Sequence, residues 1–430
     1  MASKKLKVLM FGWEFPPEIS GGLGTACYGL TSGLIENNVD VLFVVPKLFG
    51  KEETNKFRLI DAGSVEVNFQ SDHFSENLKK VSYLQIHSHI VPYVSPEEFM
   101  QRQEFDIETL KIDSTFSTAK FTFDGKYGKN LISEVSKYAA VAMQVAKDHD
   151  IDIIHAHDWL TFPAAIMAKE VSGKPLVIHI HATEFDRSGE AVNQEVYDME
   201  KRGCEAADKI ICVSRLTRRI LINRYGISPH KIVVVHNAVV PKPIKNYPKQ
   251  NLVDKNVVTF LGRITFQKGP DYFIEAAKKV LESLPDTHFV MAGNGDMFIK
   301  LLERAAELKI SNRFHFTGFL NQFETNNLFG MTDVYVMPSV SEPFGITPLE
   351  AMRTGVPVII SKQSGVAEVL NNAIKVDFWD INSVADTIIG LLKNKKISRK
   401  LAADGTDEVH GMKWEYAALK VKEVYEDTIN

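Results

Sequence analysis

Two glutamates bracket a loop that the sequence places between a buried strand and a helix. The apolar run Val334–Met337 predicts the strand, residues 341–350 form the loop, and residues 351–353 begin the helix. A helix N-terminus presents free backbone N–H groups and the positive end of its dipole, which favour an anionic ligand. Glu342 and Glu350 cannot bind a phosphate, so they are available for hydroxyl groups. This stretch therefore predicts a site for an anionic ligand that also carries hydroxyls.

The same loop contains a capping-box pattern. Thr347 would stand at the N-cap, Pro348 at N1 and Glu350 at N3. Spacing alone leaves Glu350 either as a helix cap or as a ligand-binding carboxylate.

A glycine-rich loop lies near the start of the chain. It follows a predicted strand, Leu6–Phe11, and reads Gly21-Gly22-Leu23-Gly24 before a helical stretch over residues 25–36. A dinucleotide-binding fold fits poorly, because Cys27 occupies the place of the third glycine and the glycines lie well beyond the strand end. A phosphate or sugar that approaches bare backbone explains the double glycine better. The alternative is a loop that needs positive φ.

Two predicted strands, over residues 151–159 and 176–181, carry pairs of histidines spaced by one residue. The pairs are His155 with His157, and His179 with His181. Members of a pair face the same side of their strand. The pattern allows a metal site, as in hydrolases with a barrel-mouth centre, or neutral imidazoles that hydrogen-bond a sugar, or ordinary core histidines. The alternating aspartates at 148, 150 and 152 precede a strand, so they predict a solvated turn rather than a metal-binding D-x-D pair.

Two cations flank the loop after the first strand of the second half. Arg263 and Lys268 lie within residues 262–269, between a predicted strand and a predicted helix. Such a pair can neutralise a diphosphate at a crevice. The alternative is an exposed basic loop.

Strand-like and helical patterns alternate over both halves, which predicts an α/β protein with two doubly wound domains facing each other. We expect a first domain over residues 1–240, with a long excursion at 50–130, and a second over 241–410. The linker, residues 241–249, contains three prolines and three lysines. The amphipathic segment Trp414–Ile429 is expected to pack back on the first domain, within a final unit of residues 411–430, although it could also close the second. Ligands of such folds bind between the carboxyl ends of the sheets.

Composition and charge limit the expected partners and the expected cellular compartment. A net charge of −4 gives no reason to expect nucleic acid as a partner, and three scattered cysteines favour a reduced compartment. No run approaches the ~20 apolar residues of a membrane span, and the short basic start fits a first strand better than a signal peptide. We therefore expect a cytoplasmic protein, and the sequence leaves its oligomeric state open.

Taken together, the motifs resemble those of retaining GT-B glycosyltransferases, family 4-like (group 1), a family related to sucrose, glycogen and starch synthases. The most specific motif is Glu342-x7-Glu350 with Phe344-Gly345-Ile346 inside it. The other matching segments are Gly21-Gly22-Leu23-Gly24, His157-Asp158-Trp159, Gly262-Arg263 with Lys268-Gly269, and His236-Asn237. The resemblance covers nearly the whole chain except residues 50–130, and it depends on these motifs occurring together in this order.

The resemblance implies a nucleotide-diphosphate sugar as donor, a carbohydrate as acceptor, and no metal or other cofactor. Glu342 would contact the donor sugar near the reacting carbon, and Glu350 would hold the ribose. Arg263 and Lys268 would bind the diphosphate and stabilise the negative charge of the leaving group.

The remaining implied roles belong to backbone groups and histidines. The amides of Phe344, Gly345 and Ile346 would reach the sugar and phosphate, and Gly22, beside Gly21 and Leu23, would meet the pyrophosphate when the cleft closes. His157 would bond the donor's 6-hydroxyl. His181, at the end of the neighbouring strand, is a further candidate for a sugar contact.

One position departs from a subgroup of the family. Bacterial ADP-glucose-dependent glycogen synthases have a lysine two residues before the double glycine, where this chain has Ile19. The base of the donor nucleotide therefore stays open, while the His-Asp-Trp triplet and the long excursion favour a glucosyl donor and α-glucan synthesis. The alternatives are a nucleotide-sugar epimerase of the same fold and, more remotely, a metal-dependent hydrolase built on the histidine pairs.

Overall fold

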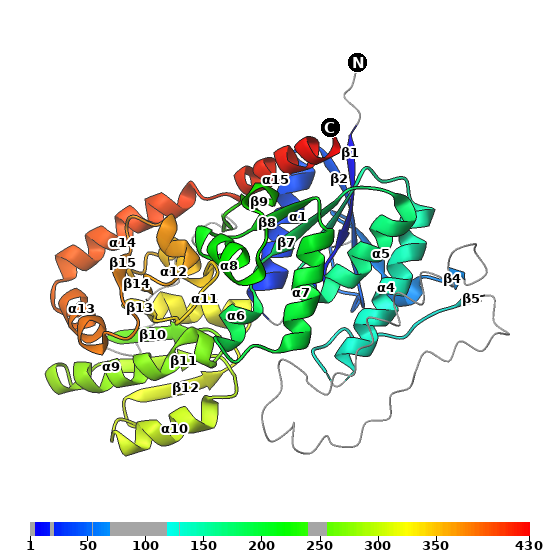
Figure 1. Cartoon of the computed structure of the whole chain (residues 1–430). Coiled ribbons are helices and arrows are strands. Elements are labelled where there is room, and N and C mark those ends of the chain that lie inside the picture. Colours follow the sequence, from blue (N-terminus) through cyan, green and yellow to red (C-terminus); the bar gives the residue numbers. More distant parts are fainter. Residues whose placement is uncertain (1–4, 18–20, 54, 69–117, 129, 240–255) are drawn as a thin grey trace.

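The computed structural model describes residues 5–17, 21–53, 55–68, 118–128, 130–239 and 256–430 (Figure 1). Within these ranges the chain forms two parallel sheets, each covered by helices on both faces, and a short antiparallel pair of β4 (Val67–Asn68) with β5 (Thr118–Ala119). The predicted linker at 241–249 and Ile19 lie outside the described residues, as does most of the excursion.

The first sheet has seven parallel strands. Their spatial order is β3 (Arg58–Asp61), β2 (Val39–Val45), β1 (Leu6–Phe11), β6 (Ile153–His157), β7 (Leu176–Ile180), β8 (Lys209–Cys212) and β9 (Ile232–Val234). Every residue of β6 and β7 is buried, because helices cover both faces of the sheet. The helices on one face are α4 (Leu131–Asp148), α5 (Phe162–Ser172), α7 (Gln194–Ala206) and α8 (Arg215–Tyr225). The opposite face packs against α1 (Gly22–Glu36) and α15 (Trp414–Ile429).

The second sheet has six parallel strands. Their order is β12 (Phe314–Gly318), β11 (His288–Ala292), β10 (Val257–Leu261), β13 (Val334–Met337), β14 (Val358–Ser361) and β15 (Ile374–Val376). One face carries α9 (Pro270–Ser283), α10 (Phe298–Glu307) and α13 (Ile381–Lys393). The other carries α11 (Gln322–Met331), α12 (Thr347–Arg353) and α14 (Lys395–His410). The predicted fold class is confirmed.

The last helix crosses back to the first sheet. In Figure 1 the red helix α15 lies over the blue elements of the first half, and its apolar stripe is part of the same buried cluster as α1. The two helices approach closely because α1 presents glycine there. A Cβ on Gly33 would stand 2.6 Å from the backbone oxygen of Trp414. The Asn37 amide donates to the carbonyl of Glu415 at 2.9 Å, which ties the end of α1 to the start of α15.

Several contacts join the two halves. The Ser341 hydroxyl donates to Asp186 Oδ1 at 2.6 Å, and Glu368 accepts from the backbone N–H groups of Arg215 and Leu216 at 2.9 and 2.8 Å. His236 Nε2 lies 3.1 Å from the Glu368 carboxylate, which holds the pKa of that carboxyl below its usual value despite partial burial. Among the described helices, none is long and apolar enough to cross a membrane.

Candidate active site

The second sheet brings together a cation and a carboxylate at its carboxyl edge. Lys268 ends a single 3-10 turn (Phe266–Lys268) after β10, and Glu342 follows β13, the strand next to β10. Lys268 Nζ donates to Glu342 Oε2 at 2.6 Å, and the Ser339 hydroxyl donates to the same oxygen at 3.3 Å. The side chains are 20% and 8% exposed, so the pair is largely shielded from water while the lysine keeps access to the surface.

A small cavity of about 30 Å³ lies beside this pair. It is lined by backbone and side chains of β10, β13 and the loops that follow them, namely Phe260, Leu261, Gly262, Lys268, Tyr335, Met337, Ser339, Glu342 and Thr347. Burial raises the pKa of Tyr335, and the nearby carboxylates of Glu342 and Glu350 raise it further. The two glutamates therefore act on one hydroxyl inside the site, although seven residues separate them.

The loop between the glutamates depends on a glycine. Gly345 has φ +100°, and a Cβ there would lie 3.1 Å from the Met337 side chain and 3.2 Å from that of Glu342. Phe344 is buried, whereas Gly345 and Ile346 are partly accessible. The tight loop delivers the chain to the start of α12 next to the Lys268–Glu342 pair.

The capping-box alternative is wrong. The residue at the N-cap of α12 is Ile346, the helix begins at Thr347, and no side chain caps it. Glu350 lies within the first turn and donates its backbone N–H to Ile346 O at 3.2 Å. The first amides of α12 are therefore not occupied by a side-chain cap, as an anion site requires.

Arg263 lies on the same loop as Lys268 but takes a different partner. Its Nη2 donates to Gln267 Oε1 at 3.3 Å, and it is not among the residues that line the small cavity. The structure thus brings Lys268 and Glu342 into contact, whereas Arg263 lies outside the lining of the small cavity.

The histidines of the first sheet form a compact stack at its carboxyl edge. His157 and His179 are paired in register on β6 and β7, and ring centroids within the group lie 4.4–5.5 Å apart. His157 Nδ1 lies 3.0 Å from His181 Nε2, and His155 Nδ1 bonds the hydroxyl of Tyr425 on α15. Burial lowers the pKa of His155 and His181 to about 3 and lowers those of the other two as well. All four rings are therefore neutral at pH 7, and His181 alone among them is partly accessible.

Asp158 connects the ends of β6 and β7 through its side chain. Its φ of +58° is unusual for a residue other than glycine. Its Oδ1 accepts from the backbone N–H of His181 at 2.7 Å. Burial raises its pKa to about 7. In the sequence, Asp158 is marked as the middle residue of the His157-Asp158-Trp159 motif, which does not reveal this bond.

The glycine-rich loop enters α1 at the same edge. Gly21 is extended, with φ −179°, Gly22 opens the helix, and neither has positive φ, so the alternative based on positive φ is wrong. Both are exposed, and a Cβ on either would meet nothing within 4 Å. Leu23 and Ile346, from opposite halves of the chain, pack against the same buried cluster, so side chains of both halves contribute to it.

The alternating aspartates lie away from the candidate site. Lys7 on β1 binds Asp150 through its Nζ at 2.6 Å and Asp152 through its backbone N–H at 3.0 Å, at the edge of the sheet opposite the histidines.

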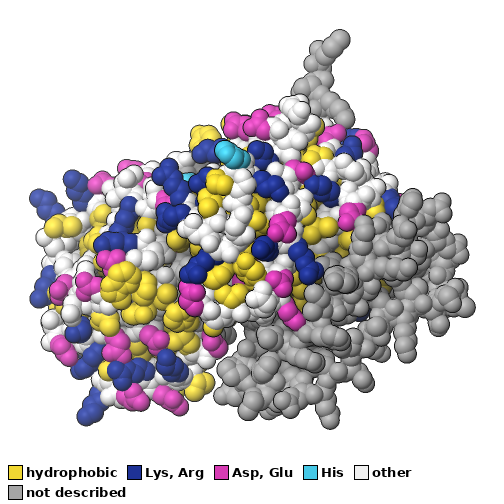
Figure 2. Space-filling view, viewed as in Figure 1, with side chains coloured by type: hydrophobic (Ala, Val, Ile, Leu, Met, Phe, Trp, Pro, Cys, Tyr) yellow, Lys and Arg dark blue, Asp and Glu magenta, His cyan; other side chains and the backbone are white. Residues whose placement is uncertain are grey.

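A larger hollow of about 480 Å³ lies between α8 and the loops after β14, and none of the predicted site residues lines it. Figure 2 shows lysine and arginine mixed with aspartate and glutamate over the described part of one face.

The comparisons with known proteins agree with this architecture. The family model described as Glycosyl transferases group 1 matches residues 244–407, and that of Glycosyltransferase Family 4 matches residues 126–242. An uncharacterized glycosyltransferase of Methanocaldococcus jannaschii is 28% identical over 86% of this chain and 84% of its own length. A glycogen synthase of Mycobacterium tuberculosis is 24% identical over 98% of this chain and 94% of its own.

The solved structures show the same fold. Sucrose-phosphate synthase from Thermosynechococcus elongatus superposes with a TM-score of 0.72 at 18% identity, covering 98% of this chain and 99% of that one. The two family models together span more than half of the sequence, one on each half of the fold. The chain is a transferase enzyme and belongs to the family 4-like glycosyltransferases of the GT-B fold.

Proposed function

We propose that the protein transfers a glucosyl group, with retention of configuration, from a nucleotide-diphosphate sugar to a carbohydrate acceptor, in the manner of an α-glucan synthase. The observation that carries this proposal is the Lys268–Glu342 pair at the start of α12, 2.6 Å apart beside a cavity that opens between β10 and β13. A lysine ammonium has three N–H donors, so Lys268 can keep its bond to Glu342 and still donate to a phosphate oxygen.

The charges suit the departure of a diphosphate. Glycosyl transfer builds positive charge on the sugar and negative charge on the leaving phosphate. Lys268 and the uncapped amides of α12 would stabilise the phosphate, while Glu342, held by Ser339 and Lys268, would face the sugar. Arg263 would join by exchanging its bond to Gln267 for one to the diphosphate. These groups supply the charge complementarity of the transfer step from the protein itself, so we propose that this step needs no metal ion.

The first sheet would supply the neutral contacts. His181 is the accessible member of the histidine stack and bonds His157, so the two can present an imidazole to a sugar hydroxyl without adding charge. Gly22 leaves open space for a pyrophosphate that approaches when the halves close. The configuration of the sugar carbon is retained if the departing phosphate assists the attack of the acceptor, and the acceptor attacks the same face of the sugar that the phosphate leaves. The three buried free thiols support a reducing compartment, and we propose the cytoplasm.

The glucan assignment rests on likeness to the mycobacterial glycogen synthase, and the test is a direct assay of products. Purified protein is incubated with UDP-, ADP- or GDP-glucose and a short α-glucan, and the products are followed by NMR. We expect one nucleotide donor to lengthen the acceptor with an α-linkage. A β-linkage would contradict retention, and no transfer from any of the three would contradict the glucosyl assignment.

The same experiment separates the epimerase alternative. An epimerase of this fold would release free nucleotide and an altered sugar when no acceptor is present. We expect the donor to remain intact without acceptor, and rapid formation of a changed sugar would favour the epimerase instead.

Donor binding is checked separately by thermal unfolding with the same three nucleotides. A ligand at a hundred times its dissociation constant adds about 2.7 kcal/mol to the free energy of unfolding. The Glu342→Ala variant should lose transfer and part of this protection while it keeps its circular dichroism spectrum. Full turnover by Glu342→Ala would contradict the proposed site.

A further inference from the structure

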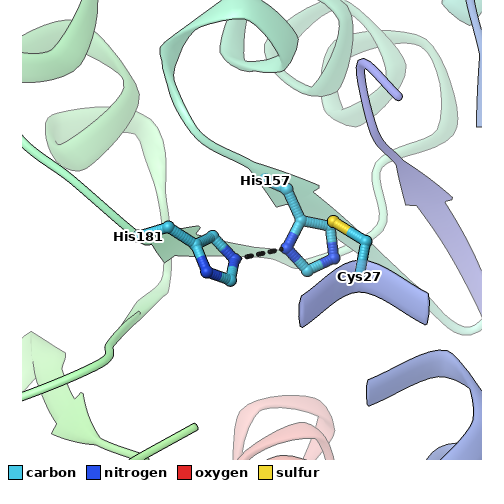
Figure 3. Close-up of side chains that lie close together, drawn as sticks. All are labelled: Cys27, His157 and His181. Atoms are coloured by element: carbon cyan, nitrogen blue, oxygen red, sulfur yellow. Dashed lines mark hydrogen bonds between the residues drawn. The ribbon is translucent and has the colours of Figure 1, made fainter. Parts of the chain in front are cut away.

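The thiol of Cys27 lies close to the histidine stack of the first sheet. Cys27 lies on α1, and Figure 3 shows its sulfur beside the ring of His157, with the ring of His181 hydrogen-bonded on the other side of His157. One ligand atom from each of these three residues lies within 4.8 Å of the other two. Cys27 and His157 are fully buried, and His181 is partly accessible at the edge. A sulfur and two imidazoles thus converge at one point near the carboxyl edge of the first sheet.

Five ring nitrogens of this stack have no hydrogen-bond partner among the described residues. His157 Nε2 and His181 Nδ1 are buried without a hydrogen-bond partner, and so are His155 Nε2 and both nitrogens of His179. Buried polar atoms in folded proteins are nearly always bonded, so the hydrogen bonds among the described residues do not satisfy this stack. The other two nitrogens of the rings near Cys27, His157 Nδ1 and His181 Nε2, lie 3.0 Å apart in one hydrogen bond.

The donor set suits a cation. An imidazole nitrogen without a proton has a lone pair that can coordinate a metal, and a divalent cation stabilises a thiolate beside it. The carboxylates of Glu14 and Asp158 also act electrostatically on the Cys27 thiol, so negative charge lies near this point.

We propose that Cys27, His157 and His181 form a zinc site. One thiolate and two imidazoles are a common donor set for Zn²⁺, and three protein ligands leave the fourth position to water. Binding would release the thiol proton to solvent, shift the N–H proton of the donating ring to that ring's other nitrogen, and replace the hydrogen bond between the two rings by two metal–nitrogen bonds. With Zn–N bonds of about 2.0–2.1 Å, tetrahedral geometry needs the two nitrogens about 3.3 Å apart, close to the 3.0 Å observed.

The zinc site has a consequence for the enzyme, which rests on the proposed function. A metal that occupies His157 and His181 removes the imidazoles offered to the donor sugar. Zinc and donor should therefore compete, and the ion would act as an inhibitor of a transfer step that does not itself use a metal.

The site is tested on the full chain, reduced and stripped of metal with a chelator, by titration with Co²⁺ as a spectroscopic substitute for Zn²⁺. We expect one equivalent to bind with the intense visible bands of tetrahedral cobalt and a near-ultraviolet sulfur-to-cobalt band, and Zn²⁺ to displace it. Cys27→Ser should abolish the sulfur band, and His181→Gln should weaken binding by more than about 100-fold, beyond the loss from a supporting partner.

Two control variants test whether the metal binds at the proposed site rather than elsewhere on the chain. Cys204→Ser removes another buried thiol, and His315→Gln removes an exposed imidazole pair, in which His288 Nδ1 lies 2.8 Å from His315 Nε2. Both variants should bind cobalt as the parent does. Persistence of the sulfur band in Cys27→Ser, loss of binding in His315→Gln, or no stoichiometric binding at micromolar Co²⁺ would each overturn the zinc site.

Competition is measured by thermal unfolding with the nucleotide sugar that protects the metal-free protein. One equivalent of Zn²⁺ should abolish most of that protection in the parent chain and little of it in Cys27→Ser. Undiminished protection in the zinc-loaded parent would overturn the competition. If no nucleotide sugar protects the metal-free protein, the proposed function fails, while the cobalt spectra still decide whether the zinc site exists.

Discussion

The carboxyl edges of the two sheets differ in the kind of interaction that they offer. The first edge carries four imidazoles that burial keeps neutral, stacked beneath α1 and α15. The second carries the ion pair of Lys268 and Glu342 at the start of a helix without a side-chain cap. Both edges come from the same doubly wound plan, so the difference lies in a few residues after the strands. A charged edge suits a diphosphate and a neutral edge suits sugar hydroxyls.

The largest effect is expected from removing the cation of the charged edge. Lys268→Ala should lower kcat/KM for transfer by roughly 10²–10³, the usual cost of losing one donor to a developing negative charge. Steady-state kinetics measure the loss, and the melting temperature reports whether the fold survives. Lys279→Ala, which removes an exposed lysine on α9, is the matched control. Equal activity of the two variants would contradict the role of the charged edge.

The neutral edge should make the protein sensitive to acid. A histidine whose folded pKa is about 3 stays neutral while the unfolded chain takes up a proton near pH 6.5, so stability falls as the pH drops below 6.5. Each such histidine costs about 1.4 kcal/mol per pH unit in that range. Asp158 acts in the opposite direction, because its raised pKa lets the folded state bind a proton first, from about pH 7 downwards.

His179→Leu isolates this contribution. It removes a buried ring with two unbonded nitrogens, so the free energy of unfolding at pH 7.5 should change by less than about 1 kcal/mol. Below pH 6.5 the variant should lose stability less steeply than the parent, by about 1.4 kcal/mol per unit. Denaturant unfolding at several pH values provides the measurement, with His230→Gln, an exposed histidine, as control. An unchanged slope would show that His179 titrates normally in the folded protein.

The neutral edge also depends on the returning helix. The Tyr425 hydroxyl bonds His155 Nδ1, and both residues are fully buried. Tyr425→Phe should cost about 1–3 kcal/mol, because it leaves a buried nitrogen without its partner. Tyr416→Phe removes a hydroxyl from an exposed tyrosine on the same helix and should be neutral. Chemical denaturation compares the two, and equal stability would mean that water replaces the lost hydroxyl.

The sequence predicted these edges unequally. Periodicity and motif spacing placed the strands and put Lys268 and Glu342 in loops after two of them, because local patterns determine those features. The sequence left open whether α15 returns to the first sheet, and the pairing of β10 with β13 is seen only in the structure. The contact of Cys27 with His157 and His181 could not be predicted, since it depends on how α1 packs over the sheet. The capping box failed for a similar reason. Gly345 turns the chain so that Ile346 takes the N-cap position, which residue types at the helix start do not reveal.

The smallest effect is expected at the contact that joins the two edges. Ser341, next to Glu342, donates to Asp186, and Asp186 also accepts from the backbone N–H and hydroxyl of Thr183. Burial raises the pKa of this carboxyl, so each bond that it accepts supports its charged form. Because Asp186 keeps both bonds from Thr183, Ser341→Ala should cost about 1 kcal/mol or less, below the usual range for a bond to a charged group.

The informative readout for Ser341→Ala is the split between kcat and KM. If the bond holds the halves near the closed arrangement, its loss should raise KM for the donor with little change in kcat, because binding must then pay for closure. Ser228→Ala, an exposed serine in the first half, should change neither. A fall in kcat alone would place Ser341 in the transfer step, and the charged edge would then extend one residue further toward the first sheet than the Lys268–Glu342 pair.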